Sequence, residues 1–165
     1  MGKRSDFERI EKDFYRTIDT KAGKILNRYL NADNSYYEPC YGQGDLVNQL
    51  DAICVGYSDI DLGKNAFDLT KEDVWKAQYI VTNPPWSRNI LHPMIEHFIK
   101  LKPTWLLFDA DWMHTKQAKP YLDYCEIIVS IGRLKWIPDT KMTGKDNCCW
   151  YLFDQNPKHN TEFHY

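Results

Sequence analysis

The chain has 165 residues, of which 43% are hydrophobic, 15% are aromatic and 27% are charged, and its formal net charge is −2. This composition excludes an intrinsically disordered chain, and the length suits one domain. The chain contains no apolar run near the about 20 residues of a membrane-spanning helix. A near-neutral charge also argues against a protein that binds nucleic acid by electrostatics alone.

The first thirty residues predict a helical segment. Ser5 and Glu8 have the spacing of a capping box, and Phe7, Ile10 and Phe14 share one helical face. The segment starts without the apolar stretch of a secretory signal, and it carries eight basic residues against five acidic ones. A solvated helix face explains these charges, and a local basic surface near residues 3–28 is the alternative.

Cysteine and histidine usage bears on the cellular compartment and on metals. Five cysteines are an odd number, and the chain has neither a CxxC pair nor a histidine cluster with zinc spacing. We therefore expect free structural thiols, a cytoplasmic location and no metal site. Asp109, Asp111 and His114 form a weak metal candidate, but Asp111 is better placed as a helix N-cap.

Beyond residue 34, short apolar runs alternate with helical segments. Strands are predicted at residues 35–37, 53–57, 79–82, 105–108, 127–131 and 150–153, and helices at 45–50, 71–77, 89–101 and 112–124. Runs without polar alternation, separated by helices, are typical of a mostly parallel sheet covered on both faces. The fold class is therefore α/β, and ligands are expected beyond the carboxyl ends of the strands.

The first two predicted strands end in residues typical of a nucleotide site. A loop at residues 38–44, Glu-Pro-Cys-Tyr-Gly-Gln-Gly, lets the backbone turn sharply and approach a ligand. Asp59 and Asp61 follow the second strand, with Asp59 twenty-one residues after Glu38. Acids at this distance from a glycine loop bind ribose hydroxyls in nucleotide-binding folds. An ordinary turn and two solvated acids are the alternative interpretation.

The third strand ends in Asn83-Pro84-Pro85-Trp86. The two prolines remove two N–H donors and stiffen the turn, and Pro84 favours an extended Asn83. The turn therefore presents hydrogen-bond acceptors beside an aromatic ring, which suits a planar group that carries an NH2. A rigid turn with a core tryptophan is the alternative.

With these motifs in this order, the chain resembles S-adenosylmethionine-dependent methyltransferases of the Rossmann-like class I, and specifically N6-adenine DNA methyltransferases, including small phage-type members. Asn83 to Trp86 resembles their catalytic motif, with tryptophan where tyrosine or phenylalanine is more usual. The resemblance implies an antiparallel C-terminal strand and S-adenosylmethionine as the cofactor. The implied cofactor-binding residues are Phe14, Tyr15, Thr17, Glu38, Pro39, Gly42, Gly44, Asp59 with Asp61 as the register alternative, Asp68, Leu69 and Asn83.

The resemblance also implies how the target base is handled. Asn83 and the Pro84 carbonyl would accept hydrogen bonds from the adenine amino group, and Trp86 would stack on a flipped-out base. Pro85 completes the implied catalytic motif, and Arg88, Arg133, Lys135 and Trp136 join Trp86 as the implied substrate-binding residues. Residues 1–165 are then one methyltransferase domain without a separate target-recognition region, which predicts weak or relaxed sequence specificity.

Several alternatives remain open at this point. The same motif would serve methylation of RNA or of a protein glutamine amide, or the chain is a catalytically silent protein that binds the cofactor and a partner. DNA is the expected partner, without a membrane and with a homodimer as an open possibility. A phage-encoded protein would work in the host cytoplasm.

Overall fold

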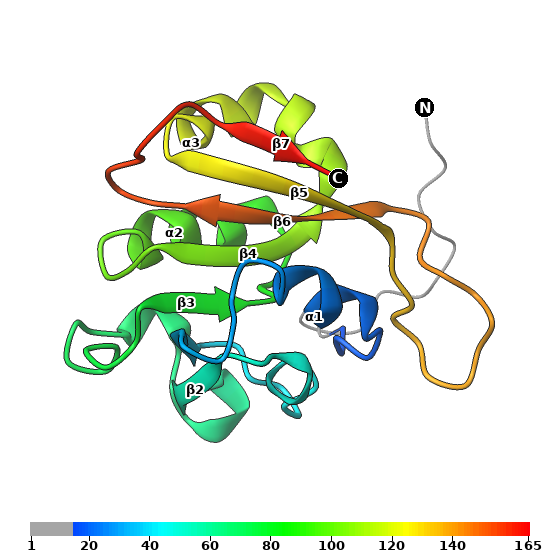
Figure 1. Ribbon diagram of the computed structural model, residues 1–165, viewed down its shortest axis with the longest axis horizontal. Helices are drawn as coiled ribbons and strands as arrows, with labels where there is room; N and C mark the ends of the chain where they lie inside the picture. Colours follow the sequence, from blue (N-terminus) through cyan, green and yellow to red (C-terminus); the bar gives the residue numbers. More distant parts are fainter. Residues whose placement is uncertain (1–14) are drawn as a thin grey trace.

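A seven-stranded sheet forms the centre of the protein, in a computed structural model that describes residues 15–165 (Figure 1). The spatial order is β2-β1-β3-β4-β6-β5-β7. The strands are β1 (Ser35–Glu38), β2 (Ile53–Tyr57), β3 (Tyr79–Thr82), β4 (Thr104–Asp109), β5 (Cys125–Arg133), β6 (Asn147–Phe153) and β7 (Glu162–His164).

One of the seven strands, β6, runs opposite to the other six. β2, β1, β3 and β4 are parallel, whereas β6 runs antiparallel to both β4 and β5. The predicted α/β class and the antiparallel C-terminal strand are therefore confirmed, and all six predicted strands are present. β7, which pairs parallel with β5, was not predicted, because Glu162-Phe163-His164 contains a single apolar residue.

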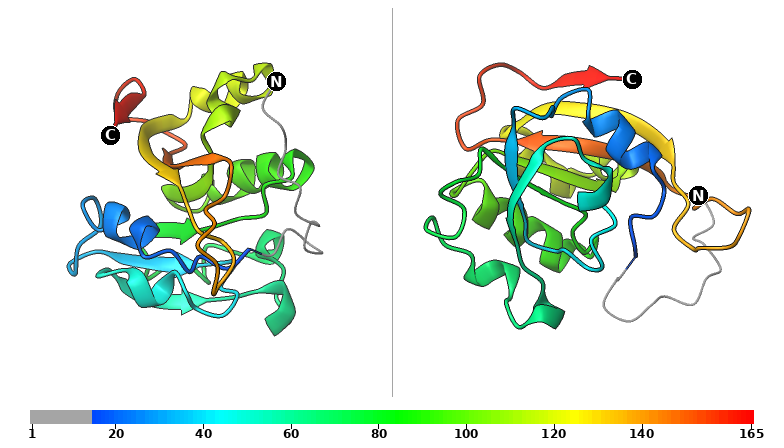
Figure 2. Two further views of the ribbon diagram at one scale, coloured as in Figure 1. Left: turned by 90° about the vertical axis from the view of Figure 1, so that its right-hand side faces the viewer. Right: turned by 60° about the horizontal axis from the view of Figure 1, so that its bottom comes forward.

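Helices cover both faces of the sheet, because each central strand is apolar on both sides. In β4, Trp105 and Leu107 point into the core under α1 (Lys21–Leu26), while Leu106 and Phe108 point into the core under α2 (Arg88–Phe98). The left view of Figure 2 shows α1 in blue and α2 in green on opposite sides of the sheet. Burial on both faces explains the unalternating apolar runs of the sequence.

The N-terminal segment is less helical than predicted. In its described part, residues 15–19 are irregular and only α1 is helical, so the expectation of a helix through residue 30 is wrong. Residues 1–14, with Ser5, Glu8 and Phe14, lie outside the described residues. Gly23 lies so close to Gln49 that a Cβ at this position would be 2.4 Å from the Gln49 Cβ. The glycine therefore lets α1 pack directly on the segment before β2.

Three of the four other predicted helices are short turns or are missing. Residues 45–50 form the 3₁₀ turn η2 (Val47–Gln49), residues 71–77 form turns without a helix, and residues 112–124 divide into η5 (Ala110–His114), η6 (Lys116–Ala118) and α3 (Lys119–Leu122). Thr115 divides this last stretch, because its hydroxyl accepts a hydrogen bond from the Ala118 N–H and starts a new turn. Asp109, rather than Asp111, caps η5.

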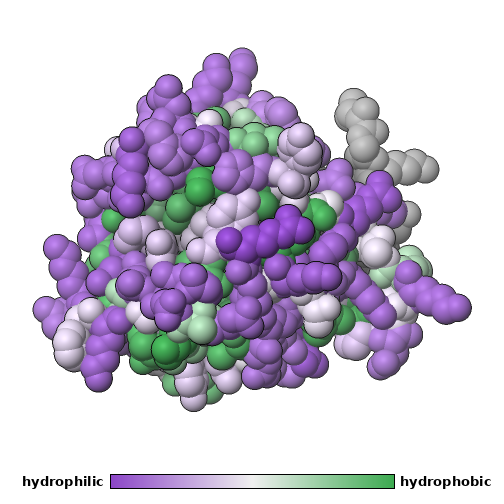
Figure 3. Space-filling model, in the orientation of Figure 1, coloured by the Kyte–Doolittle hydropathy of each residue, from purple (hydrophilic) through white to green (hydrophobic). Residues whose placement is uncertain are grey.

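Two surface features complete the description. β2 is an edge strand and exposes Ile53, Val55 and Tyr57, and apolar side chains accordingly show at the surface over β2 in Figure 3. All five cysteines are free thiols. No helix formed by residues 15–165 combines the length and the apolar character needed to cross a membrane.

Candidate functional site

A cleft of about 410 Å³ lies beyond the carboxyl ends of β1, β2 and β3. This size falls in the usual range for small-molecule sites. Nine of the residues predicted from the sequence line it together, namely Tyr15, Thr17, Glu38, Pro39, Gly42, Asp59, Asp61, Asn83 and Pro85. The predicted cofactor segment, glycine loop, acids and proline turn therefore meet in one place.

The structure places several predicted residues away from this cleft. Asp68 is exposed at the end of η4 (Ala66–Asp68), and Leu69 is buried in the core under α2. Asn65, Ala66 and Phe67 line the cleft instead. Ile90 and Met94 of α2 were also missed, although their spacing of four residues directly after the proline turn would have placed both on one helical face.

The glycine loop is held in its conformation by Asp59. Gly42 and Gly44 adopt φ values of +57° and +80°, and a Cβ on Gly44 would lie 2.5 Å from the Tyr41 hydroxyl oxygen. The buried Asp59 carboxylate accepts from the Gly42 N–H at 2.8 Å and from the Asp61 N–H at 2.9 Å. Asp59 thus ties the loop after β1 to η3 (Ile60–Leu62), and Asp61 is exposed at the cleft wall.

Glu38 is a buried acid at the end of β1. Its carboxyl accepts a hydrogen bond from the Cys40 N–H at 3.0 Å. Burial, with a smaller contribution from the negative charge of Asp59, raises the pKa of Glu38 to about 8, although the hydrogen bond from Cys40 opposes this shift. The group is therefore largely protonated at neutral pH, and a cation in the cleft would favour its ionised form.

The N-terminal segment closes one side of the cleft. Arg16 makes a bidentate ion pair with Asp45, with N–O distances of 2.8 and 2.7 Å, directly after the glycine loop. Gln49 bridges the same parts, since its side chain donates to the Thr17 carbonyl and accepts from the Gly23 N–H. These contacts hold Tyr15 and Thr17 over the strand ends.

Asn83 lines the same cleft, and its side-chain nitrogen uses both of its N–H groups in hydrogen bonds. Its Nδ2 donates to the Thr17 hydroxyl at 3.1 Å and to the Tyr15 carbonyl at 3.3 Å. Its Oδ1 accepts from the Trp86 indole N–H at 3.1 Å. The proline turn is therefore joined to the N-terminal segment through this one amide.

Three aromatic side chains meet beside Asn83. The Trp136 ring lies 5.5 Å from the Trp86 ring in an edge-on arrangement and 6.4 Å from the Tyr15 ring. Trp136 belongs to the long segment between β5 and β6, drawn in orange in Figure 1. Two predicted substrate-binding residues, Trp86 and Trp136, are thus close in space although they are fifty positions apart in sequence.

The predicted basic residues have different surroundings. The Arg88 guanidinium is paired with Asp109 at 2.7 Å and also donates to the Trp86 carbonyl. Arg133 is exposed, and the backbone around it is tied to the N-terminal segment, because the Arg133 carbonyl accepts from Lys21 and the Lys135 N–H donates to Asp19. The structure therefore leaves Arg133 directed to solvent and Arg88 engaged.

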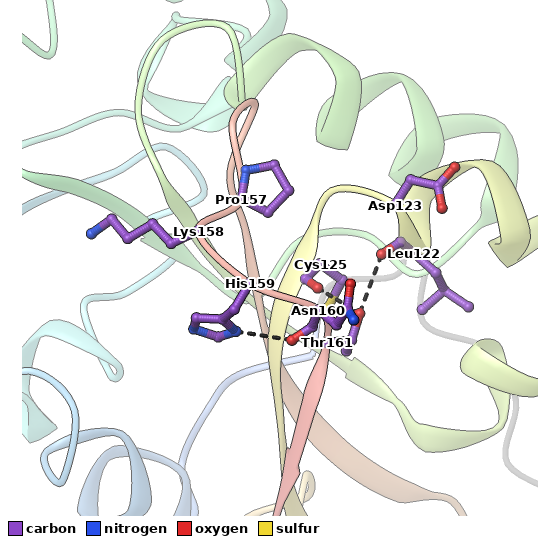
Figure 4. A pocket seen from close by; sticks show the side chains of 8 residues that line it. All are labelled: Leu122, Asp123, Cys125, Pro157, Lys158, His159, Asn160 and Thr161. Carbon is purple, nitrogen blue, oxygen red and sulfur yellow. Dashed lines mark hydrogen bonds between the residues drawn. The ribbon is translucent and has the colours of Figure 1, made fainter.

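A second hollow, of about 470 Å³, lies between α3 and the segment before β7 (Figure 4). Its polar groups are mostly bonded to nearby backbone: the Thr161 hydroxyl contacts the carbonyls of Leu122 and Cys125, and His159 contacts the Asn160 carbonyl. It contains none of the motifs singled out from the sequence, so the cleft at the strand ends is the stronger candidate.

The sequence matches no protein-family model and no curated protein sequence. Among solved structures, the chain is similar to a protein described as the modification subunit of a type I restriction enzyme from Vibrio vulnificus YJ016, at 11% identity and a TM-score of 0.50, over 90% of this chain and 46% of that one. The fold is a Rossmann-like methyltransferase fold. At this identity, the likeness shows the fold alone.

Two further structures have lower TM-scores. A dimethyladenosine transferase from Plasmodium falciparum matches at 13% identity and a TM-score of 0.49, over 81% of this chain and 59% of that one. The M protein of the type I restriction enzyme EcoKI matches at 12% identity and a TM-score of 0.47, over 86% and 45%. The chain thus spans about half the length of the solved structures it matches.

The side chains that line the cleft fit a cationic nucleoside compound. Glu38 and Asp61 provide acidic groups, while Phe67, Ile90 and Met94 provide apolar walls. Such a combination suits S-adenosylmethionine, which has a sulfonium charge, a ribose and a flat base. Among residues 15–165, no group of three or more His, Cys, Asp and Glu side chains is arranged to hold a metal ion.

Proposed function

We propose that this chain transfers a methyl group from S-adenosylmethionine to the exocyclic N6 amino group of adenine in DNA. The observation that carries the proposal is the position of Asn83 and Pro85 in the wall of the cleft that Glu38, Gly42 and Asp61 also line. The proposed cofactor site and the proline turn at residues 83–86 therefore share one cavity. Transfer of a methyl group from the cofactor to an amino group requires this proximity.

The chain's own residues have a limited chemical task in this reaction. The exocyclic nitrogen of adenine is a poor nucleophile, because its lone pair is delocalised into the ring. Hydrogen bonds from this amino group to the Asn83 Oδ1 and the Pro84 carbonyl would favour a pyramidal nitrogen and stabilise the positive charge that develops on it. When bound, S-adenosylmethionine supplies an activated methyl group on its sulfonium.

The segment between β5 and β6 supports a nucleic-acid substrate. Arg133 and Lys135 lie next to Trp136, and basic side chains with an aromatic ring suit phosphate contacts plus stacking on an unpaired base. The amino group of a base in duplex DNA is reached only after the base leaves the stack. Because contacts from Arg133 and Lys135 to phosphates would carry no sequence information, we propose weak or relaxed sequence specificity.

Methyl-labelled S-adenosylmethionine tests the proposal when DNA, RNA and protein pools are incubated separately with the purified chain. We expect label in DNA, and digestion to nucleosides should give N6-methyladenine. The Asn83→Ala variant is the matched control and should lose nearly all labelling of DNA while still binding the cofactor in calorimetry. Label in RNA or protein alone would contradict the DNA assignment, and cofactor binding without label in any pool would favour a silent binding protein.

A further inference from the structure

The side-chain amide of Asn83 has two ends of opposite character. Its oxygen accepts hydrogen bonds, its nitrogen donates two, and a rotation of 180° exchanges them. Only one orientation offers an acceptor to a substrate amino group, and the other would direct N–H groups at it. The proposed reaction therefore depends on what holds this amide in place.

Two partners of Asn83 have a fixed hydrogen-bonding role. The Trp86 indole N–H can only donate, and it lies 3.1 Å from the Asn83 Oδ1. The Tyr15 carbonyl can only accept, and it lies 3.3 Å from the Asn83 Nδ2. Either contact alone sets the orientation of the amide, and both require the same one. The Thr17 hydroxyl, which works as donor or acceptor, completes the set at 3.1 Å.

This geometry determines what remains for a ligand. Both Nδ2 hydrogens are used, by Thr17 and Tyr15, whereas Oδ1 has two acceptor positions and Trp86 uses one. Asn83 therefore has a single acceptor position left, on an atom of a residue that lines the cleft. A group that donates an N–H fits this position, and a carbonyl or ring nitrogen does not.

Trp86 is itself fixed. Its indole N–H also donates to the Leu107 carbonyl of β4 at 3.1 Å, and its half-buried ring packs against the cores on both faces of the sheet. The indole thus spans from the turn after β3 to the neighbouring strand. Phenylalanine, which is usual at this place in the proline motif, has no N–H to offer.

We infer that Trp86 and the Tyr15 carbonyl act as a lock on the Asn83 amide, and that Trp86 is a positioning residue that restricts the reaction to substrates whose reacting group donates a hydrogen bond. This inference rests on the proposed methyl transfer and extends it. In this protein the aromatic residue of the proline motif orients the acceptor through its indole N–H, in addition to any contact of its ring with the base.

The test compares two Trp→Phe variants, each of which removes one indole N–H, at position 86 or at position 105. Trp86→Phe should lower kcat about tenfold, the value of one hydrogen bond of about 1.4 kcal/mol, while KM for S-adenosylmethionine stays within about twofold. Trp105→Phe is the control: Trp105 is more deeply buried than Trp86, and its indole N–H has no partner among the described residues. This variant should keep the kcat of the unmodified protein.

A second measurement does not depend on activity. In ¹⁵N-labelled protein, Asn83→Ala should shift the indole resonance of Trp86, assigned by its loss in Trp86→Phe, and leave that of Trp105 in place. The lock is overturned if the Trp86 resonance does not move, or if Trp86→Phe and Trp105→Phe have the same kcat. A shift in a protein that methylates no amino-bearing substrate would support the lock and contradict the proposed function instead.

Discussion

The cleft at the carboxyl ends of β1, β2 and β3 and the segment between β5 and β6 differ in how they are held. Around the cleft, Asp59, Gln49 and Asn83 each join two separate parts of the chain through buried or half-buried hydrogen bonds. The other segment is largely exposed and is tied to the N-terminal part through Asp19 and Lys21. The cleft is therefore the rigid region, and the segment between β5 and β6 carries the exposed charge that the proposal assigns to nucleic-acid binding.

This difference separates two kinds of expected effect. Substitutions in the cleft should change catalysis, cofactor affinity or stability steeply, because each removes a bond that positions several other groups. Substitutions in the segment between β5 and β6 should change nucleic-acid binding gradually and in a salt-dependent way. Four substitutions, taken from the largest expected effect to the smallest, test whether the cleft controls catalysis and cofactor binding and the other segment controls nucleic-acid binding.

Asn83→Ala should reduce kcat by about a hundredfold to a thousandfold, because it removes the acceptor that faces the reacting nitrogen. Cofactor affinity, measured by calorimetry, should change little, since Glu38, Gly42 and Asp61 remain in the cleft wall. Full turnover by this variant would show that the proline turn is only a structural element.

Asp59→Ala should lower cofactor affinity about tenfold to a hundredfold and the free energy of unfolding by about 1–3 kcal/mol, because two buried N–H groups lose their acceptor. Asp61→Ala keeps both of these bonds and is the matched control. It should weaken cofactor binding and lower the thermal midpoint less than Asp59→Ala does. Equal loss of stability in the two variants would contradict the bracing role of Asp59.

Glu38→Gln should change how cofactor binding depends on pH. Burial raises the pKa of Glu38 to about 8, so the free protein holds this proton at lower pH, and a bound cation releases it. Affinity should therefore increase about tenfold from pH 6 to pH 8 in the unmodified protein and level off above its pKa.

The glutamine variant has no proton to release, so its affinity should lose this increase. Because both proteins are titrated with the same ligand, the titration of the ligand itself cancels in their difference. Parallel pH profiles for the two proteins would place the cation away from Glu38.

Arg133→Ala should weaken DNA binding by only a few fold and reduce the slope of log K against log salt by about 0.9, the value of one phosphate contact. Lys100→Ala is the control, because Lys100 is exposed between α2 and the start of β4, whereas the cleft lies at the carboxyl ends of the strands. An unchanged slope for Arg133→Ala would remove the segment between β5 and β6 from the proposed interface.

The sequence predicts the structure well where a residue type or pattern is compatible with only one local structure. Apolar runs marked six strands, and Gly42, Asp59 and Asn83 came from motifs whose chemistry needs those residues at the ends of strands. The helices were predicted less well, because single capping groups such as Thr115 interrupt a favourable pattern. The role of Trp86 was not accessible, since its bond to Asn83 depends on how the turn after β3 packs on Leu107.

The most direct test of the account is nucleoside mass spectrometry of DNA after incubation with S-adenosylmethionine that carries a deuterated methyl group. Unmethylated duplex and single-stranded DNA should be compared in parallel, with Asn83→Ala as the control. The account predicts deuterated N6-methyladenine with the unmodified protein and about a hundredfold to a thousandfold less with the variant. Label on another base or on a ring nitrogen, or equal label with both proteins, would contradict it.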